Sequence, residues 1–144
     1  MNKYVTLLTN LAVIASLVFL ALEIRQNNSM LVLEARNAIS DARNELVLTN
    51  MNNRELIIAR EKAARGEELA SVEEMQILLF FFAVFRTWQD QFFSFQAGVI
   101  TEEQMDSEAL TWRRSIKVPY VAKEWQRQKP ELTPEFVAFI EQSP

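Results

Sequence analysis

Acidic side chains have the widest chemical repertoire in this sequence, and several occur in pairs. Glu73-Glu74 and Glu102-Glu103 are adjacent carboxylates, and Asp90 follows Arg86 by four residues. Paired carboxylates can act as general acid and base or hold a metal ion. Both glutamate pairs fall in predicted first helical turns, where acids favour the helix dipole, and Arg86 with Asp90 has the spacing of an ion pair near the core. We therefore expect structural roles; an enzyme using carboxylates alone would need these groups to converge in a pocket.

The sequence lacks the two side chains on which most catalysis and metal binding depend. Its 144 residues include no Cys and no His, which excludes thiolate chemistry, disulfides, haem ligation, the usual zinc sites and a histidine base. Gly66 and Gly98 are the only glycines, so no glycine-rich phosphate loop can form. The net charge of −4 provides no basic field for nucleic acid. We expect no cofactor, no metal, no nucleic-acid partner and no enzymatic activity.

An uncharged apolar run near the N-terminus predicts a membrane anchor. Residues 5–22 read VTLLTNLAVIASLVFLAL, with Lys3 before them and Glu23 and Arg25 after them. Eighteen uncharged, mainly apolar residues are about the shortest practical length for a transmembrane helix. A cleaved signal peptide has a similar beginning, but no convincing A-x-A site of small residues follows this run. We therefore predict a retained span, with the buried helix of a soluble protein as the alternative.

Polar and small residues lie on one side of this predicted helix. Thr9, Ser16 and Glu23 recur every seven residues, and Ala12 with Ser16 forms a small-xxx-small pair that permits close helix contact. The stripe Thr9, Ala12, Ser16 and Glu23 favours self-association or a membrane-protein partner. A homo-oligomeric channel lined by the stripe is the second hypothesis. Hydrogen bonding of each hydroxyl within its own helix is the third.

We predict an all-α fold in which a long N-terminal transmembrane helix continues into a small, aromatic-cored helical bundle. The boundaries are 1–28 for the anchor and interface, 29–50 for a helical extension, and 51–144 for the bundle domain. Nothing before Gly66 forces the first helix to stop, so it is expected to reach about Leu48, before a turn at 49–53. Further helices are predicted to begin at an Asn52 cap, at a Ser71–Glu74 capping box, at a Thr101–Gln104 capping box, at Pro119 and at Thr133-Pro134.

The middle of the bundle carries an aromatic stripe and a basic segment. The aromatic residues repeat at alternating four- and three-residue spacing, as expected of a core-facing helix: Phe81, Phe85, Trp88, Phe92 and Phe95. Residues 112–129 are rich in cations with interleaved aromatics, a composition that suits an anionic membrane surface. The candidate patch comprises Arg113, Arg114, Lys117, Lys123, Arg127 and Lys129. The alternative is an ordinary amphipathic segment with these cations facing water.

Several of these features together resemble a group of uncharacterised bacterial single-span membrane proteins. The matching features are the residues 20–27 (LALEIRQN) at the span exit, the Trp112-Arg113 pair, Trp125, and the closing 133–136 (TPEF). The resemblance implies a single span with an I-R-Q-N-like exit, an aromatic-rich helical middle and a final S/T-P-E-F helix. It implies a bacterial inner-membrane location, and the group has no known activity to carry over to this sequence.

The cations near the span set the expected orientation. Lys3 and the amino terminus stand on one side, and Arg25, Arg36 and Arg43 on the other, which favours a cytoplasmic C-terminal domain. The leading hypothesis is a non-enzymatic membrane protein whose helical domain mediates protein interaction, in a homo-oligomer or as a small subunit of a membrane complex.

Overall fold

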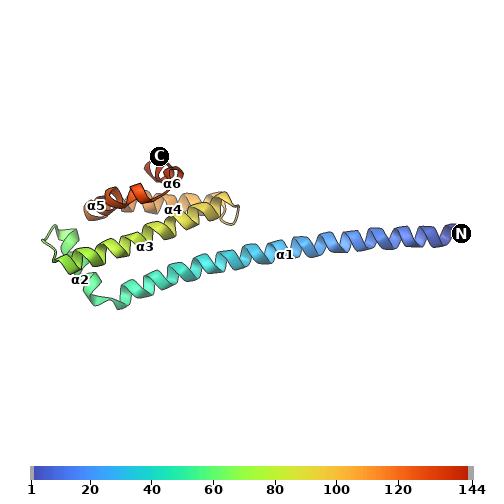
Figure 1. The fold of residues 1–144 in the computed structure, drawn as a ribbon, viewed down its shortest axis with the longest axis horizontal. Helices are drawn as coiled ribbons and strands as arrows, with labels where there is room; N and C mark the ends of the chain where they lie inside the picture. The colour runs from blue at the N-terminus through green and yellow to red at the C-terminus, as the bar shows by residue number, and fades with distance from the viewer. Residues whose placement is uncertain (1, 143–144) are drawn as a thin grey trace. The chain divides into compact units, whose positions relative to one another are not determined.

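The computed structural model describes residues 2–142, and these residues form helices and no strands. Figure 1 shows their order along the chain. The elements are α1 (Lys3–Asn52), α2 (Arg54–Arg65), α3 (Ser71–Gln96), α4 (Glu102–Ser115), α5 (Pro119–Gln128), a 3-10 turn η1 (Lys129–Glu131) and α6 (Pro134–Glu141). The all-α prediction is confirmed.

The chain divides into two units, and the first, which extends to Asn37, is the apolar part of α1. Every side chain from Asn2 to Leu31 is exposed. The most apolar eighteen-residue stretch of α1 has a mean hydropathy of 2.4, and none of it is buried. By length and composition this helix can cross a membrane, and it is the one such helix in residues 2–142.

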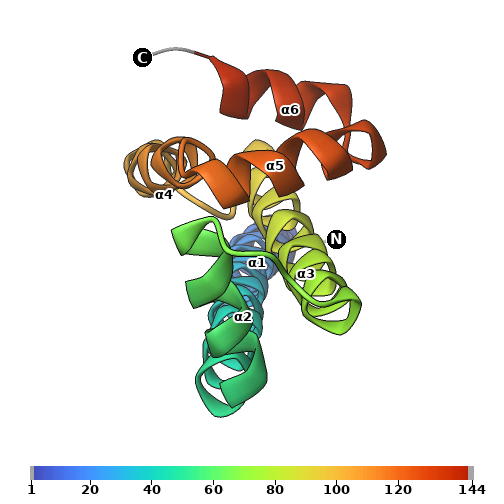
Figure 2. The ribbon, with the colours of Figure 1, turned by 90° about the vertical axis from the view of Figure 1, so that its left-hand side faces the viewer.

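The second unit begins at Ala38 and contains the last turns of α1 with α2–α6. Helices α2 and α5 both pack on α3, as Figure 2 shows. Helix α4 packs on α6. The buried side chains of these helices form a single apolar cluster that consists of Leu56, Ala59, Ile77, Phe81, Phe85, Phe92, Met105, Trp112, Val121, Trp125, Leu132, Phe136 and Ile140. The bundle therefore has one core.

Aromatic rings fill the centre of this core. Phe85 is fully buried and meets Trp125 edge to face, with 5.2 Å between ring centroids. Trp88 and Trp112 stack at 5.4 Å with an interplanar angle of 12°, which joins α3 to α4. Such ring pairs add to the burial of apolar area. The predicted aromatic core is confirmed, with Trp88 and Phe95 at its half-buried edge.

Helix α1 continues beyond its predicted end. The expected turn at 49–53 reduces to Asn53, the one non-helical residue between α1 and α2. The asparagines there serve α2 rather than a loop: Asn50 Oδ1 accepts a hydrogen bond from Arg60 Nη1 at 2.9 Å. Asn53 Oδ1 accepts one from the Leu56 amide at 3.0 Å. The cap of α2 is thus Asn53, and the prediction of Asn52 was wrong by one residue.

The α3 cap is also displaced by one residue from its prediction. Ala70 occupies the cap position, and its amide donates to Glu73 Oε2 at 2.9 Å, so Ser71 is already helical. Alanine offers no side-chain acceptor, so only the Glu73 half of the predicted box forms. At α4 both halves form, because Thr101 and Gln104 exchange hydrogen bonds of 3.3 and 3.2 Å as predicted.

Helix α6 is capped by a residue from α3. Thr133 precedes α6, but its buried hydroxyl oxygen has no hydrogen-bond partner among residues 2–142. The Thr133 amide instead donates to Gln89 Oε1 at 2.8 Å. A capping box uses a Glu or Gln three residues into the helix for this bond, and here that position is Phe136, which is fully buried. Gln89 therefore supplies the missing acceptor from a neighbouring helix.

Candidate functional site

The carboxylates considered for catalysis lie apart on the bundle surface. Asp90 is exposed, and the predicted ion pair with Arg86 was wrong: Arg86 Nη2 donates to the Glu131 carbonyl at 3.1 Å, and its guanidinium lies over the Phe82 ring. The Arg86 guanidinium is therefore held by a backbone carbonyl and an aromatic ring, and not by the exposed carboxylate of Asp90. In residues 2–142 no group of three His, Cys, Asp or Glu side chains is placed to hold a metal ion.

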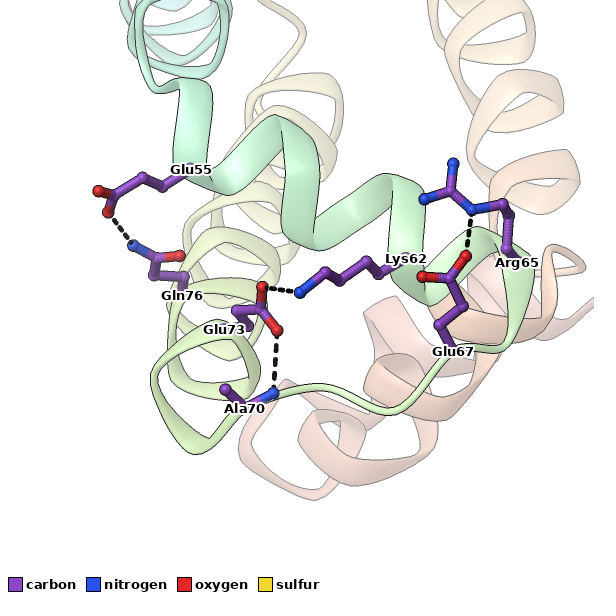
Figure 3. A network of polar contacts seen from close by, with 7 residues as sticks. All are labelled: Glu55, Lys62, Arg65, Glu67, Ala70, Glu73 and Gln76. Atoms are coloured by element: carbon purple, nitrogen blue, oxygen red, sulfur yellow. Dashed lines mark hydrogen bonds and ion pairs between the residues drawn. The ribbon is translucent and has the colours of Figure 1, made fainter.

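Glu73, the first residue of the glutamate pair near the start of α3, has a structural role, which Figure 3 shows. Glu73 Oε1 accepts from Lys62 Nζ of α2 at 2.6 Å, while its other oxygen accepts from the Ala70 amide. These hydrogen bonds, that from Lys62 first, lower the pKa of Glu73 below its ordinary value. Beside them, Gln76 Nε2 donates to Glu55 Oε2 at 3.3 Å. Both contacts fasten α2 to α3.

The polar stripe on α1 lies on one face of an exposed helix. Thr9 Oγ1 donates to the Val5 carbonyl at 2.9 Å, and Ser16 Oγ donates to the Ala12 carbonyl at 2.8 Å. The two hydroxyl protons are therefore satisfied within α1, as one of the alternatives held. Glu23 follows the candidate span on the same face. Contact along this stripe would use the small Ala12 and Ser16 side chains rather than these two donors.

Two cations of the basic segment are engaged inside the bundle. Arg113 Nη2 donates to the Phe139 carbonyl at 2.9 Å, and its guanidinium lies 5.2 Å from the Phe139 ring centre. Lys129 Nζ donates to Glu141 Oε1 at 2.9 Å, and the Trp125 indole donates to the same oxygen at 3.0 Å. The indole first, and then the ammonium, lower the pKa of Glu141 below its ordinary value.

The other four cations of the candidate patch are exposed: Arg114, Lys117, Lys123 and Arg127. Their surroundings are not uniformly basic, because Lys123 lines a hollow that also contains carboxylates. The patch is thus divided between surface cations and structural ones. Membrane contact by the exposed group stays a prediction.

The positions of three polar residues, Arg43, Gln89 and Glu124, were missed by reasoning from sequence. Arg43 of α1 donates to both Glu108 of α4 and Gln91 of α3. Gln89 caps α6, and Glu124 lies buried on α5. The available signal was a single polar residue among core positions: Gln89 lies between Phe85 and Phe92, and Glu124 directly precedes Trp125.

Two features of the described chain are candidates for function: the exposed apolar helix α1 and the surface of the bundle that follows it. No protein-family model, no curated protein and no solved structure matches the chain.

Proposed function

We propose that this chain is a non-enzymatic, single-span membrane protein of the bacterial inner membrane whose helical bundle mediates protein interaction. In this proposal it works as a homo-oligomer or as a small subunit of a larger membrane complex. The observation that carries the proposal is the apolar part of α1, a continuous helix with every side chain exposed from Asn2 to Leu31.

Exposed apolar surface on this scale supports insertion in a bilayer. Large apolar side chains from Tyr4 to Ile24 are each at least half exposed. A soluble monomer rarely exposes an apolar patch larger than about 300–600 Å². At 1.5 Å per residue, the eighteen residues from Val5 to Leu22 span about 27 Å, which is close to the hydrocarbon thickness of a bilayer. Lys3 and Arg25 flank this segment, where headgroups would surround them.

Interaction by the bundle is supported by a second apolar stripe, on the outer face of α3. Val72, Met75, Leu79 and Phe82 follow three- and four-residue spacing and are 69%, 54%, 59% and 42% exposed. They lie opposite the core stripe of the same helix, so α3 is apolar on both faces. An apolar face that the bundle leaves uncovered suits contact with another protein. The orientation that we propose, with a cytoplasmic bundle, follows the cations after the span.

Crosslinking in native membranes tests both the insertion of α1 and contact along its polar stripe. The chain has no cysteine, so Ser16→Cys introduces a unique thiol on the stripe. Val18→Cys is the matched control, because two residues turn the helix by about 200° at nearly the same depth. We expect oxidation to join Ser16→Cys chains into a dimer, or to a partner subunit, and to leave Val18→Cys chains as monomers. The protein should stay in the membrane fraction after alkaline extraction.

Four results would contradict the proposal. Release of the protein by alkaline extraction would remove the span, and loss of residues 5–22 from the purified protein would make them a signal peptide. A monodisperse monomer in detergent, with equal crosslinking at residues 16 and 18, would contradict both self-association and a stable partner subunit. In reconstituted bilayers we expect no conductance; a conductance that Glu23→Leu abolishes would favour a channel instead.

A further inference from the structure

A hollow of about 600 Å³ opens in the bundle beside the loop that joins α2 to α3. Gly66, at φ +72°, ends α2 in the left-handed conformation and directs the chain into this loop. The first turns of α3 and α5 form the remaining walls. The charged side chains that line the hollow are Glu67, Glu68, Glu74, Lys123 and Glu124. Four carboxylates thus face one ammonium.

Glu124 is the unusual member of this set because it is buried. Only 5% of it is exposed, and it lies on the inward face of α5 with Val121 and Gln128. Its Oε2 accepts a bond of 3.3 Å from the neutral amide of Gln128, and no other hydrogen bond to this carboxylate is formed within residues 2–142. No Lys or Arg nitrogen of the described chain forms an ion pair with it. A buried carboxylate without a cation is costly.

Gln128 cannot supply the missing charge. Its Nε2 is shared between Glu124 and the Leu78 carbonyl, and its own buried carbonyl oxygen has no partner in the described part of the chain. Glu124 and Gln128 therefore lack some of the hydrogen-bond donors that their buried oxygens need, as far as residues 2–142 supply them. Since Glu124 lines the hollow, its unpartnered oxygen can be reached by a donor from outside the chain.

The uncharged residues that line the hollow indicate which kind of cation would fit. Tyr120 lines the hollow and is held edge-on against Phe81 at 5.9 Å, and the buried Ile77 contributes an apolar floor. An aromatic ring and a carboxylate side by side suit an ammonium group, and an apolar floor suits a methylene chain. The carboxylates of the described chain are too dispersed to hold a single metal ion.

The rim carries a second, separate group of negative charges. Glu67 is already paired with Arg65, as Figure 3 shows, whereas Glu68 and Glu74 are exposed and form no ion pair with the described residues. We infer that this hollow binds a linear alkyl polyamine, with one ammonium at Glu124 and another at the rim. This site is independent of the membrane role proposed above.

Calorimetric titration of the full-length protein in detergent with spermidine tests the inference. We expect saturable binding that weakens about tenfold or more in Glu124→Gln, because the variant removes the buried charge of the hollow. Glu103→Gln is the matched control, since Glu103 is an exposed carboxylate on α4 outside the hollow; its affinity should be unchanged. Lys123→Met removes the competing cation and should tighten binding about threefold or more.

Several outcomes would overturn the inference: no saturable heat, equal affinity of the wild type and Glu124→Gln, or equal binding of uncharged 1,4-butanediol. If Glu124→Gln does not fold, Lys123→Met decides, and an affinity equal to wild type refutes the site. A protein that binds spermidine but leaves the membrane on alkaline extraction would refute the proposed function alone.

Discussion

The cap that α3 provides for α6 allows a quantitative prediction. Replacing Gln89 with Leu keeps the volume of this buried side chain but removes the acceptor for the Thr133 amide, 2.8 Å away. The Thr133 hydroxyl oxygen is buried and unpartnered in the described chain, so it does not already stabilise this helix start. The amide would remain in an apolar site without an acceptor.

The magnitude follows from two opposing terms. An unsatisfied buried donor costs about 1–3 kcal/mol. The added apolar carbon of Leu returns about 0.8 kcal/mol. The difference is about 0.2–2.2 kcal/mol, so we expect Gln89→Leu to lower the free energy of unfolding by about 1 kcal/mol, near the middle of that range. The loss should be concentrated where α6 holds Phe136 and Ile140 in the core.

Differential scanning calorimetry of the full chain measures this loss, and amide hydrogen exchange locates it. Exchange should accelerate in α6 more than in α2, which does not contact Gln89 through any hydrogen bond. Gln126→Leu is the control: Gln126 is exposed on α5, and its substitution should change stability by less than about 0.5 kcal/mol. If Gln89→Leu is as stable as Gln126→Leu, or if α6 exchanges at the wild-type rate, the capping argument is refuted.

Three further substitutions are predicted from the same bundle. Because the pKa of Glu141 is lowered, its contacts stabilise the fold above the ordinary carboxyl range and lose that effect as pH falls through the lowered value. Thermal unfolding should show Glu141→Gln about 0.5 kcal/mol less stable at neutral pH and equal to wild type in acid, because exposure weakens the pair; a constant difference would contradict this. Phe85→Ala should cost about 3–5 kcal/mol in urea unfolding, since Phe85 is fully buried, and a loss below 1 kcal/mol would refute the core assignment. Gly66→Ala should cost about 1 kcal/mol of thermal stability through its left-handed backbone alone, because a Cβ there meets no atom within 4 Å; an unchanged melting temperature would contradict that.

Features governed by local spacing were predictable from sequence, and features that need a tertiary partner were not. The Thr101–Gln104 box was predicted because it depends on residues three positions apart. The caps at Asn53 and Ala70 were displaced by one residue, since neighbouring Asn and Glu residues offered two equivalent spacings. The apolar character of the helix over residues 5–22 was also predictable, because this run contains no charged residue.

Long-range contacts defeated the same reasoning. Arg86 has a carboxylate one turn away on its own helix, yet it bonds to the Glu131 carbonyl, which lies 45 residues later. Arg113 and Lys129 read as surface cations, but α6 provides each with an acceptor, at Phe139 and Glu141. The sequence shows that Arg113 and Lys129 are charged, but their acceptors depend on how α6 packs against the rest of the bundle.

The distribution of tryptophan gives the molecule a built-in optical reporter. All three indoles, Trp88, Trp112 and Trp125, belong to the bundle core or its edge, and α1 contains none. Far-ultraviolet circular dichroism of the whole chain would be dominated by helix that includes α1, and would remain strong if only the bundle melted. Intrinsic fluorescence and the near-ultraviolet signal of the stacked Trp88 and Trp112 rings would respond to the bundle alone. The two units can therefore be followed separately in one unlabelled sample.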